Sequence, residues 1–104
     1  MKTEIQYKGL QAGVHLEEQL ERDFKIIEEK FGWVDHIIVH LIKDKNCTCE
    51  VIARGKMQKE IFVKDEGEKF EKVITNTFDK LDRQLRKTKE KIISTIFFIL
   101  IWHK

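Results

Sequence analysis

The sequence is short of residues that stiffen or cross-link a chain, with no proline and only two cysteines in 104 residues. Cys47 and Cys49 are two positions apart, and on an extended strand their Cα atoms are too far apart for an easy bridge. A disulfide framework is therefore excluded, and a reducing cytoplasm is the expected compartment. Repeats and low-complexity linkers are also lacking, so a single small domain is expected.

The patterns of an enzyme are missing as well. The sequence has no recognisable nucleophile–base pair, no paired-carboxylate motif and no glycine-rich loop for phosphate groups. Its carboxylates are mostly interspersed with lysines on predicted helix surfaces, where a solvated face explains them. These absences predict a non-enzymatic protein with no cofactor and no small-molecule substrate.

Long hydrophobic runs are also absent. The polar segment after Met1 has neither the apolar core nor the cleavage pattern of a signal peptide, so export is not expected. The tail, residues 92–104, is apolar over about 11 residues, well short of the roughly 20 that a helix needs to cross a bilayer. We expect no membrane span and a short buried segment, which extends the preceding helix, covers an open sheet face or seats in a partner.

Two stretches have the apolar spacing of amphipathic helices. The first has Gly13 as its N-cap, stops at Gly32, and carries apolar residues at intervals of three or four: Leu16, Leu20, Phe24, Ile27 and Phe31. The second has one apolar side, formed by Phe70, Ile74, Thr77, Leu81, Leu85, Thr88 and Ile92. Acidic residues at positions 65, 66 and 68 are expected at the start of this second helix, where they favour the positive end of its dipole.

Four stretches alternate or are rich in β-branched residues, and they predict strands at residues 3–8, 33–43, 47–54 and 60–64. In the second strand, the residues expected to face the helices are Ile37, Val39 and Leu41. A polar turn at residues 44–46 follows. The order is β-α-β-β-β-α, and each helix has a single apolar stripe. The predicted fold is therefore α+β, with two helices packed on one face of a four-stranded, mainly antiparallel sheet.

Charge is unevenly distributed in a chain whose net charge is only +2. Residues 14–31 carry six acids and three bases, whereas residues 76–91 carry six bases and three acids. Four cations at helical spacing share one narrow sector of the second helix: Lys80, Arg83, Lys87 and Lys91. Because like charges one turn apart repel each other, an anionic partner with repeating charge explains this row. A solvated lysine-rich face near a helix C-terminus is the alternative explanation.

A resemblance to a known family comes from the second helix. The segment Phe78-Asp79-Lys80-Leu81-Asp82-Arg83-Gln84-Leu85-Arg86-Lys87 resembles the hydrophobe-Asp/Asn-Lys-Leu-x-Arg-Gln-Leu-x-Lys signature of the bacterial ribosome hibernation-promoting factors, the family that includes protein Y. Weaker correspondences extend the resemblance over residues 3–91. The chain resembles the short class, without the second domain that pairs two ribosomes in long members. We therefore expect a hibernation-factor-like, ribosome-binding domain at residues 1–91 and an apolar tail at residues 92–104.

The resemblance implies a factor that binds the small ribosomal subunit and its ribosomal RNA over the decoding region. It would block messenger RNA and the A- and P-site transfer RNAs, so that translation stops in idle ribosomes, as in stationary phase or under stress. The residues implied as contacts to RNA phosphates are Lys8, Lys80, Arg83, Lys87 and, less strictly, Lys91. Arg86 and Lys89 are added from charge alone. Charge reversal at Lys80, Arg83 and Lys87 is expected to preserve folding, because the predicted helix places them in solvent.

Three departures from the family pattern are present. The stretch before the signature usually reads Asp-hydrophobe-Tyr-Ala-Ala-Ile-Asp, but residues 69–75 read KFEKVIT, so its aromatic and acidic contacts are not carried over. The usual Ser/Thr cap of the first helix is replaced by Gly13, at a cost of only a few tenths of a kcal/mol. The tail is apolar, whereas tails of the short class are polar.

Three other interpretations stay open. If residues 44–45 form the hairpin tip, one sheet face would carry a possible zinc ligand set of His36, His40, Cys47 and Cys49, although the spacing fits no known finger or ribbon. A similar layer of sheet and helices also binds duplex RNA by shape, so a general double-stranded RNA-binding module is the principal alternative. The third is an interaction protein that acts through the apolar tail.

Overall fold

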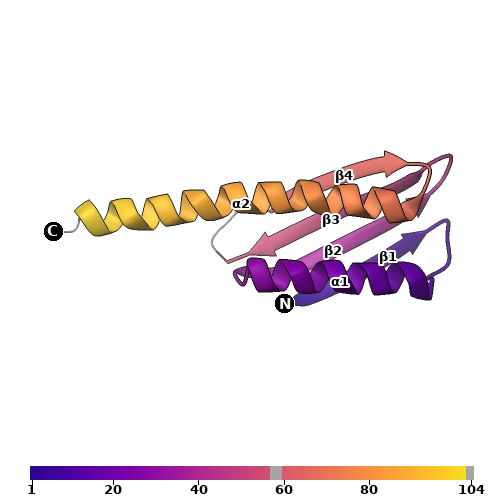
Figure 1. Cartoon of the computed structure of the whole chain (residues 1–104), viewed down its shortest axis with the longest axis horizontal. Helices are drawn as coiled ribbons and strands as arrows, with labels where there is room; N and C mark the ends of the chain where they lie inside the picture. Colours follow the sequence, from indigo (N-terminus) through magenta and orange to yellow (C-terminus); the bar gives the residue numbers. More distant parts are fainter. Residues whose placement is uncertain (57–59, 103–104) are drawn as a thin grey trace.

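Six elements form one layer of sheet and one layer of helices. The computed structural model describes the backbone of residues 1–56 and 60–102, and the side chains of residues 1–56, 60–89 and 99–101. The elements are β1 (Lys2–Lys8), α1 (Val14–Lys30), β2 (Val34–Lys43), β3 (Cys47–Gly55), β4 (Ile61–Gly67) and α2 (Phe70–Trp102). Both helices lie on the same face of the sheet (Figure 1). The predicted element order and α+β fold are confirmed.

The sheet has the strand order β1-β2-β3-β4, so neighbours in the chain are neighbours in the sheet. β1 pairs with β2 in parallel, because α1 carries the chain back across the sheet between them. The β2–β3 and β3–β4 pairs are antiparallel. The predicted turn after β2 is present, and the Asp44 N–H donates to the Asn46 carbonyl at 3.1 Å. The sheet is therefore mainly antiparallel, as expected.

The core lies between the sheet and the two helices. Ile37, Val39 and Leu41 are fully buried on the helix-facing side of β2, as the alternation predicted. The buried side of α2 also includes Val73 and Phe78, beyond the predicted stripe. The remaining buried residues of the two helices are Leu20, Phe24, Ile27, Ile74, Thr77, Leu81 and Leu85. The Phe24 and Phe78 rings pack edge to face, with their centroids 6.0 Å apart, and so connect the two helices above the sheet.

The predicted end of the fourth strand is wrong. β4 continues to Gly67, so Asp65 and Glu66 are strand residues and do not open the second helix. The reason is the pairing of β3 with β4, which continues to the first residue of β3, so that Cys47 lies opposite Gly67. α2 begins only at Phe70. The Val73 N–H donates to the carbonyl of Lys69, the residue just before the helix, at 3.1 Å. This shift places the carboxylate of Asp65 beside the middle of α2.

As far as Trp102 the tail extends the second helix, the first of the three expected arrangements. The expected burial is wrong for the tail residues whose side chains are described, because Ile99, Leu100 and Ile101 are exposed. α2 is continuous for 33 residues and projects beyond the end of the sheet where β2 begins and β3 ends (Figure 1). The longest dimension of the molecule is accordingly 57 Å. Within the described residues, no helix is long and apolar enough to cross a membrane.

Candidate nucleic-acid interface

The α2 basic row, defined as Lys80, Arg83 and Lys87, lies on the flank of α2 that faces away from α1. All three residues are exposed, as the helical spacing predicted. Arg83 and Lys87 have no ion-pair partner among the side chains that the structure describes. The side chain of Lys91, the fourth member by sequence, lies outside the described residues. Lys72, also exposed, lies two turns before Lys80 on the same flank. It was not among the predicted contacts, although its position eight residues before Lys80 is a signal present in the sequence.

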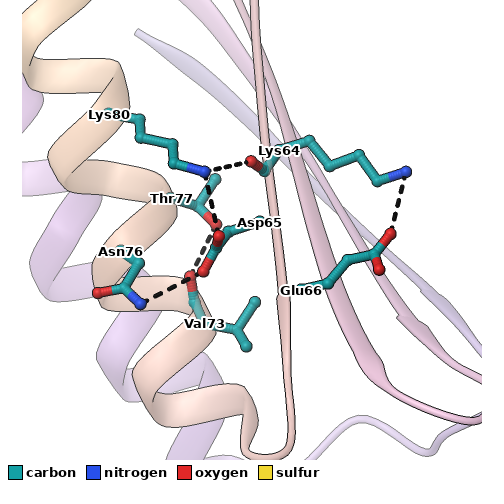
Figure 2. Close-up of polar contacts among 7 residues, drawn as sticks. All are labelled: Lys64, Asp65, Glu66, Val73, Asn76, Thr77 and Lys80. Carbon is teal, nitrogen blue, oxygen red and sulfur yellow. Dashed lines mark hydrogen bonds and ion pairs between the residues drawn. The ribbon is translucent and has the colours of Figure 1, made fainter.

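Lys80 is the member of the row that is fixed to the fold (Figure 2). Its ammonium lies 3.0 Å from Asp65 Oδ1 and donates to the Lys64 carbonyl of β4 at 2.9 Å. The Asn76 amide donates to the other Asp65 oxygen at 3.3 Å. The Lys80 ammonium is the main cause that holds the pKa of Asp65 below its ordinary value. Lys80 is therefore both an exposed cation and a link between α2 and the edge strand β4.

From this geometry we expect charge reversal at Lys80 to lower stability, more than reversal at Arg83 or Lys87. A glutamate at position 80 would place a second carboxylate against Asp65 and against the Lys64 carbonyl. The Lys80 side chain is 46% exposed and that of Asp65 only 21% exposed. Like charges at this separation destabilise the fold. Arg83 and Lys87 are the positions where the charge can be tested without disturbing a link to the sheet.

Replacing Lys80 by methionine is expected to lower the free energy of unfolding at neutral pH by about 1 kcal/mol, because the Lys64 carbonyl loses this donor and Asp65 keeps only the Asn76 amide. Lys80 depresses the folded-state pKa of Asp65, so its contribution is present above the ordinary carboxyl pKa and is lost as the pH falls through the depressed value. Urea unfolding across this acidic range measures the difference.

Lys87→Met is the matched control for Lys80→Met, since it removes a cation from the same helix flank. It should change stability by less than about 0.5 kcal/mol. Equal losses in the two variants would show that the link between Lys80 and β4 contributes nothing to stability.

Arg86 and Lys89, predicted from charge alone, lie on the other flank of α2, the one toward α1. The Arg86 guanidinium is hydrogen-bonded to Asp82, which also lies 3.7 Å from Lys30 of α1. Arg86, with Lys30 as a lesser cause, lowers the pKa of Asp82. Arg86 is thus already paired with a carboxylate. The structure does not join these two residues to the α2 basic row.

An acidic groove of about 210 Å³ separates the two helices. Its lining includes Asp23 of α1 and Asp79 and Asp82 of α2. Burial, with a smaller contribution from the nearby Asp79 carboxylate, raises the pKa of Asp23 to about 6. Near neutral pH the groove therefore holds three carboxylates against Lys30. A phosphate backbone would be repelled here, so the opposite flank of α2 is the side suited to a polyanion.

Replacing Asp23 by asparagine is expected to stabilise the protein by about 1 kcal/mol at about pH 7.5, after allowance for its half-exposed carboxyl. The folded-state pKa is raised, so the penalty for the charged form is absent below the ordinary value, grows as the pH rises and is complete above about 6. The gain should therefore vanish at about pH 4, as measured by urea unfolding. Glu21→Gln, at an exposed position of α1, is the control; a pH-independent gain for D23N would contradict this account.

Lys8, the remaining predicted contact, is far from the α2 basic row across the sheet. It is exposed at the end of β1, which is the edge strand opposite β4. The structure therefore does not bring Lys8 together with Lys80, Arg83 and Lys87. Any anion at Lys8 would be a separate segment from one that follows α2.

The hypothetical zinc ligands do not share a face. The hairpin register pairs Leu41 with Cys49 and His40 with Glu50, one residue away from the arrangement that a zinc site needs. Since a one-residue slip turns a side chain to the other face, both cysteines are buried under the helices and both histidines lie on the open face. Burial raises the pKa of the Cys49 thiol to about 12. Within the described residues, no group of three or more potential ligands could hold a metal ion.

Comparisons with known proteins agree with this fold. A family model described as Sigma 54 modulation protein / S30EA ribosomal protein matches residues 3–93. No curated protein matches the chain. A ribosomal subunit interface protein from Coxiella burnetii is similar in structure, with 20% sequence identity, a TM-score of 0.74, and coverage of 84% of this chain and 98% of that one. The N-terminal domain of Protein Y from Thermus thermophilus has 13% identity, a TM-score of 0.76, and coverage of 85% and 99%, respectively. At these identities the two structures establish a shared fold.

Proposed function

The chain belongs to the Sigma 54 modulation protein / S30EA ribosomal protein family, as the α2 signature predicted, and from this premise we propose that it binds the small ribosomal subunit at the decoding region. There it blocks messenger RNA and the A- and P-site transfer RNAs and inhibits translation in idle cytoplasmic ribosomes. The family description names a modulator and a ribosomal protein, not a reaction. The proposed action needs no catalysis and no cofactor.

The observation that carries the proposal is the α2 basic row on an exposed flank of a rigid helix. Successive cations recur about every turn, or about 5.4 Å along the axis. Lys80 donates to Asp65 and to the Lys64 carbonyl, and an ammonium has three donors, so one stays available for a phosphate oxygen. Arg83 adds a planar fork that suits bidentate phosphate contact. Such contacts bind RNA strongly without reading its sequence, which suits a fixed RNA-lined channel.

Charge asymmetry supports a single orientation in that channel. The α1–α2 groove, with Asp23, Asp79 and Asp82, would face away from ribosomal RNA. In this arrangement Lys91 continues the α2 basic row by its spacing. Lys8 would contact a separate RNA segment, because the sheet lies between it and the row. Arg86 and Lys89 lie on the flank of α2 toward the α1–α2 groove and are left out of the proposed contact. Specificity would then come from the shape of folded RNA.

Co-sedimentation with purified small ribosomal subunits tests the proposal, with and without transfer RNA and messenger RNA, across a salt series. We expect saturable binding that transfer RNA competes away. If about four cations neutralise phosphates, log K should fall with log salt with a slope of about −3 to −4.

Two results would count against the proposal. Absence of binding at low salt would overturn it directly. Equally tight binding to free duplex RNA, with no competition by transfer RNA on the subunit, would favour the alternative of a general double-stranded RNA-binding module.

A further inference from the structure

The open face of the sheet, opposite the helices, carries an apolar row that no other described element covers. The register pairs Ile38 with Ile52 and Ile52 with Phe62, so these three side chains share this face across three strands. Phe62 is 55% exposed. Polar residues flank the row one step away on each side, with His36 next to Arg54 and His40 next to Glu50. The open-face row, Ile38–Ile52–Phe62, is thus a bounded apolar patch.

The end of α2 is a second uncovered apolar surface. Residues 92–102 contain no charged side chain. Ile99, Leu100 and Ile101 are all strongly exposed, with Leu100 at 66%. Three consecutive helical residues point in three directions, since each turns by 100°, so apolar surface lies all round the helix at this point. A helix that is apolar all round is stable in water only when another surface covers it.

We propose that the end of α2, residues 92–102, packs on the open-face row of a second copy of this chain, and that the second copy makes the same contact in return. The geometry allows this because the helices and the open-face row lie on opposite faces of the sheet. When two sheets lie end to end about a two-fold axis in their common plane, the helices of one copy lie on the side of the partner's open face. Each α2 then passes straight onto the partner's sheet, and the interface is isologous.

The helix is long enough for this contact. α2 packs on its own sheet as far as Leu85, which is fully buried, and it leaves at the end where β2 begins (Figure 1). From Leu85 to Trp102 the helix spans about 25 Å. Ile38 lies four residues into β2 from Val34, which is about 13 Å from the sheet end. The α2 end can therefore cross the junction and place residues 99–101 over the open-face row.

Reciprocity is what favours a second copy as the occupant. A single apolar helix about 16 Å long and about 10 Å wide covers too little surface for a stable dimer. Two such contacts, with the abutting sheet ends, bury on the order of 1,000 Å², near the lower range of specific interfaces. The same arrangement covers both uncovered apolar surfaces of each chain at once. It does not depend on the proposed ribosomal function.

Sedimentation-velocity centrifugation of the full chain across micromolar concentrations tests the dimer, without ribosomes or RNA. We expect a monomer–dimer equilibrium whose Kd rises by at least about tenfold in Phe62→Lys and also in Leu100→Lys. Val14→Lys is the matched control, because Val14 is an apolar residue with 71% exposure, on α1, outside both surfaces. Its Kd should equal that of the original chain. Should Phe62→Lys not fold, Phe62→Ser tests the same contact.

Three outcomes would overturn the proposal. The first is a monomer at every concentration. The second is a dimer weakened by L100K but not by F62K, which would mean that the helix ends pair with each other. The third is a monomer that binds phosphatidylcholine vesicles through Leu100 and not through Phe62, which would assign the α2 end to a lipid surface.

Discussion

Replacing Arg83 and Lys87 together by glutamate is expected to weaken binding to the small ribosomal subunit by at least about 100-fold at moderate salt. Each residue is proposed to make a charge-assisted contact with a phosphate, worth about 1.5–3 kcal/mol, and each reversal also introduces repulsion. Both side chains are exposed, and neither has an ion-pair partner among the described side chains, so the fold should be unchanged. Co-sedimentation measures the affinity, and urea unfolding verifies the stability.

Lys45→Glu with Lys56→Glu is the control for that double variant. Both lysines are exposed in turns. Either double variant changes the net charge from +2 to −2, because each reversal replaces one positive charge by one negative charge. If binding depended only on net charge, both double variants would bind the small subunit equally weakly. That result would contradict the proposed role of the α2 basic row, whereas a loss confined to R83E/K87E supports it. The salt slope of R83E/K87E should also be shallower by about two.

Replacing Gly9 by alanine is expected to lower the free energy of unfolding by about 3 kcal/mol. Gly9 has a φ of +78°, a left-handed conformation that alanine adopts only at a cost. A Cβ atom at this position would lie 2.2 Å from the Lys43 carbonyl oxygen, a backbone atom that cannot move aside alone. The end of β1 runs beside the end of β2, with Lys8 opposite Ile42, so the shift would disturb the parallel pairing of these two strands. Urea unfolding measures the loss.

Gly32→Ala is the matched control, since an added Cβ there meets nothing within 4 Å and the backbone is not left-handed. It should change stability by less than about 0.5 kcal/mol. If both alanine variants are equally stable, the tight approach of Gly9 to Lys43 is not a constraint on the fold.

Local patterns in the sequence were sufficient for the type and order of the elements and for most of their buried residues. The spacing of Leu20, Phe24 and Ile27 predicted α1. Its N-cap is Gly13, as predicted, and its C-cap is Phe31, one residue before the predicted stop at Gly32. The alternation in β2 predicted which side chains are buried. These features depend on periods of 3.6 and 2 residues, which neighbours along the chain define by themselves. The signature in α2 likewise predicted the family, and the helical spacing predicted the exposure of the α2 basic row.

Long-range pairing decided the rest, because no local pattern specifies which residue lies opposite which. The β2–β3 register places Cys49 on the sheet face opposite to that of His40, so the hypothetical zinc ligands cannot meet. The β3–β4 register lengthened β4 and brought Asp65 to Lys80, which turned a predicted surface cation into a link between helix and sheet.

The sequence by itself determined the element order, the amphipathic faces and the position of three cations on one flank of α2, since each depends on the spacing of nearby residues. Only the tertiary structure decided which of the seven predicted contacts lie together. It separated Lys8 by the width of the sheet and paired Arg86 with Asp82, because those distances follow from how the strands and helices pack against each other.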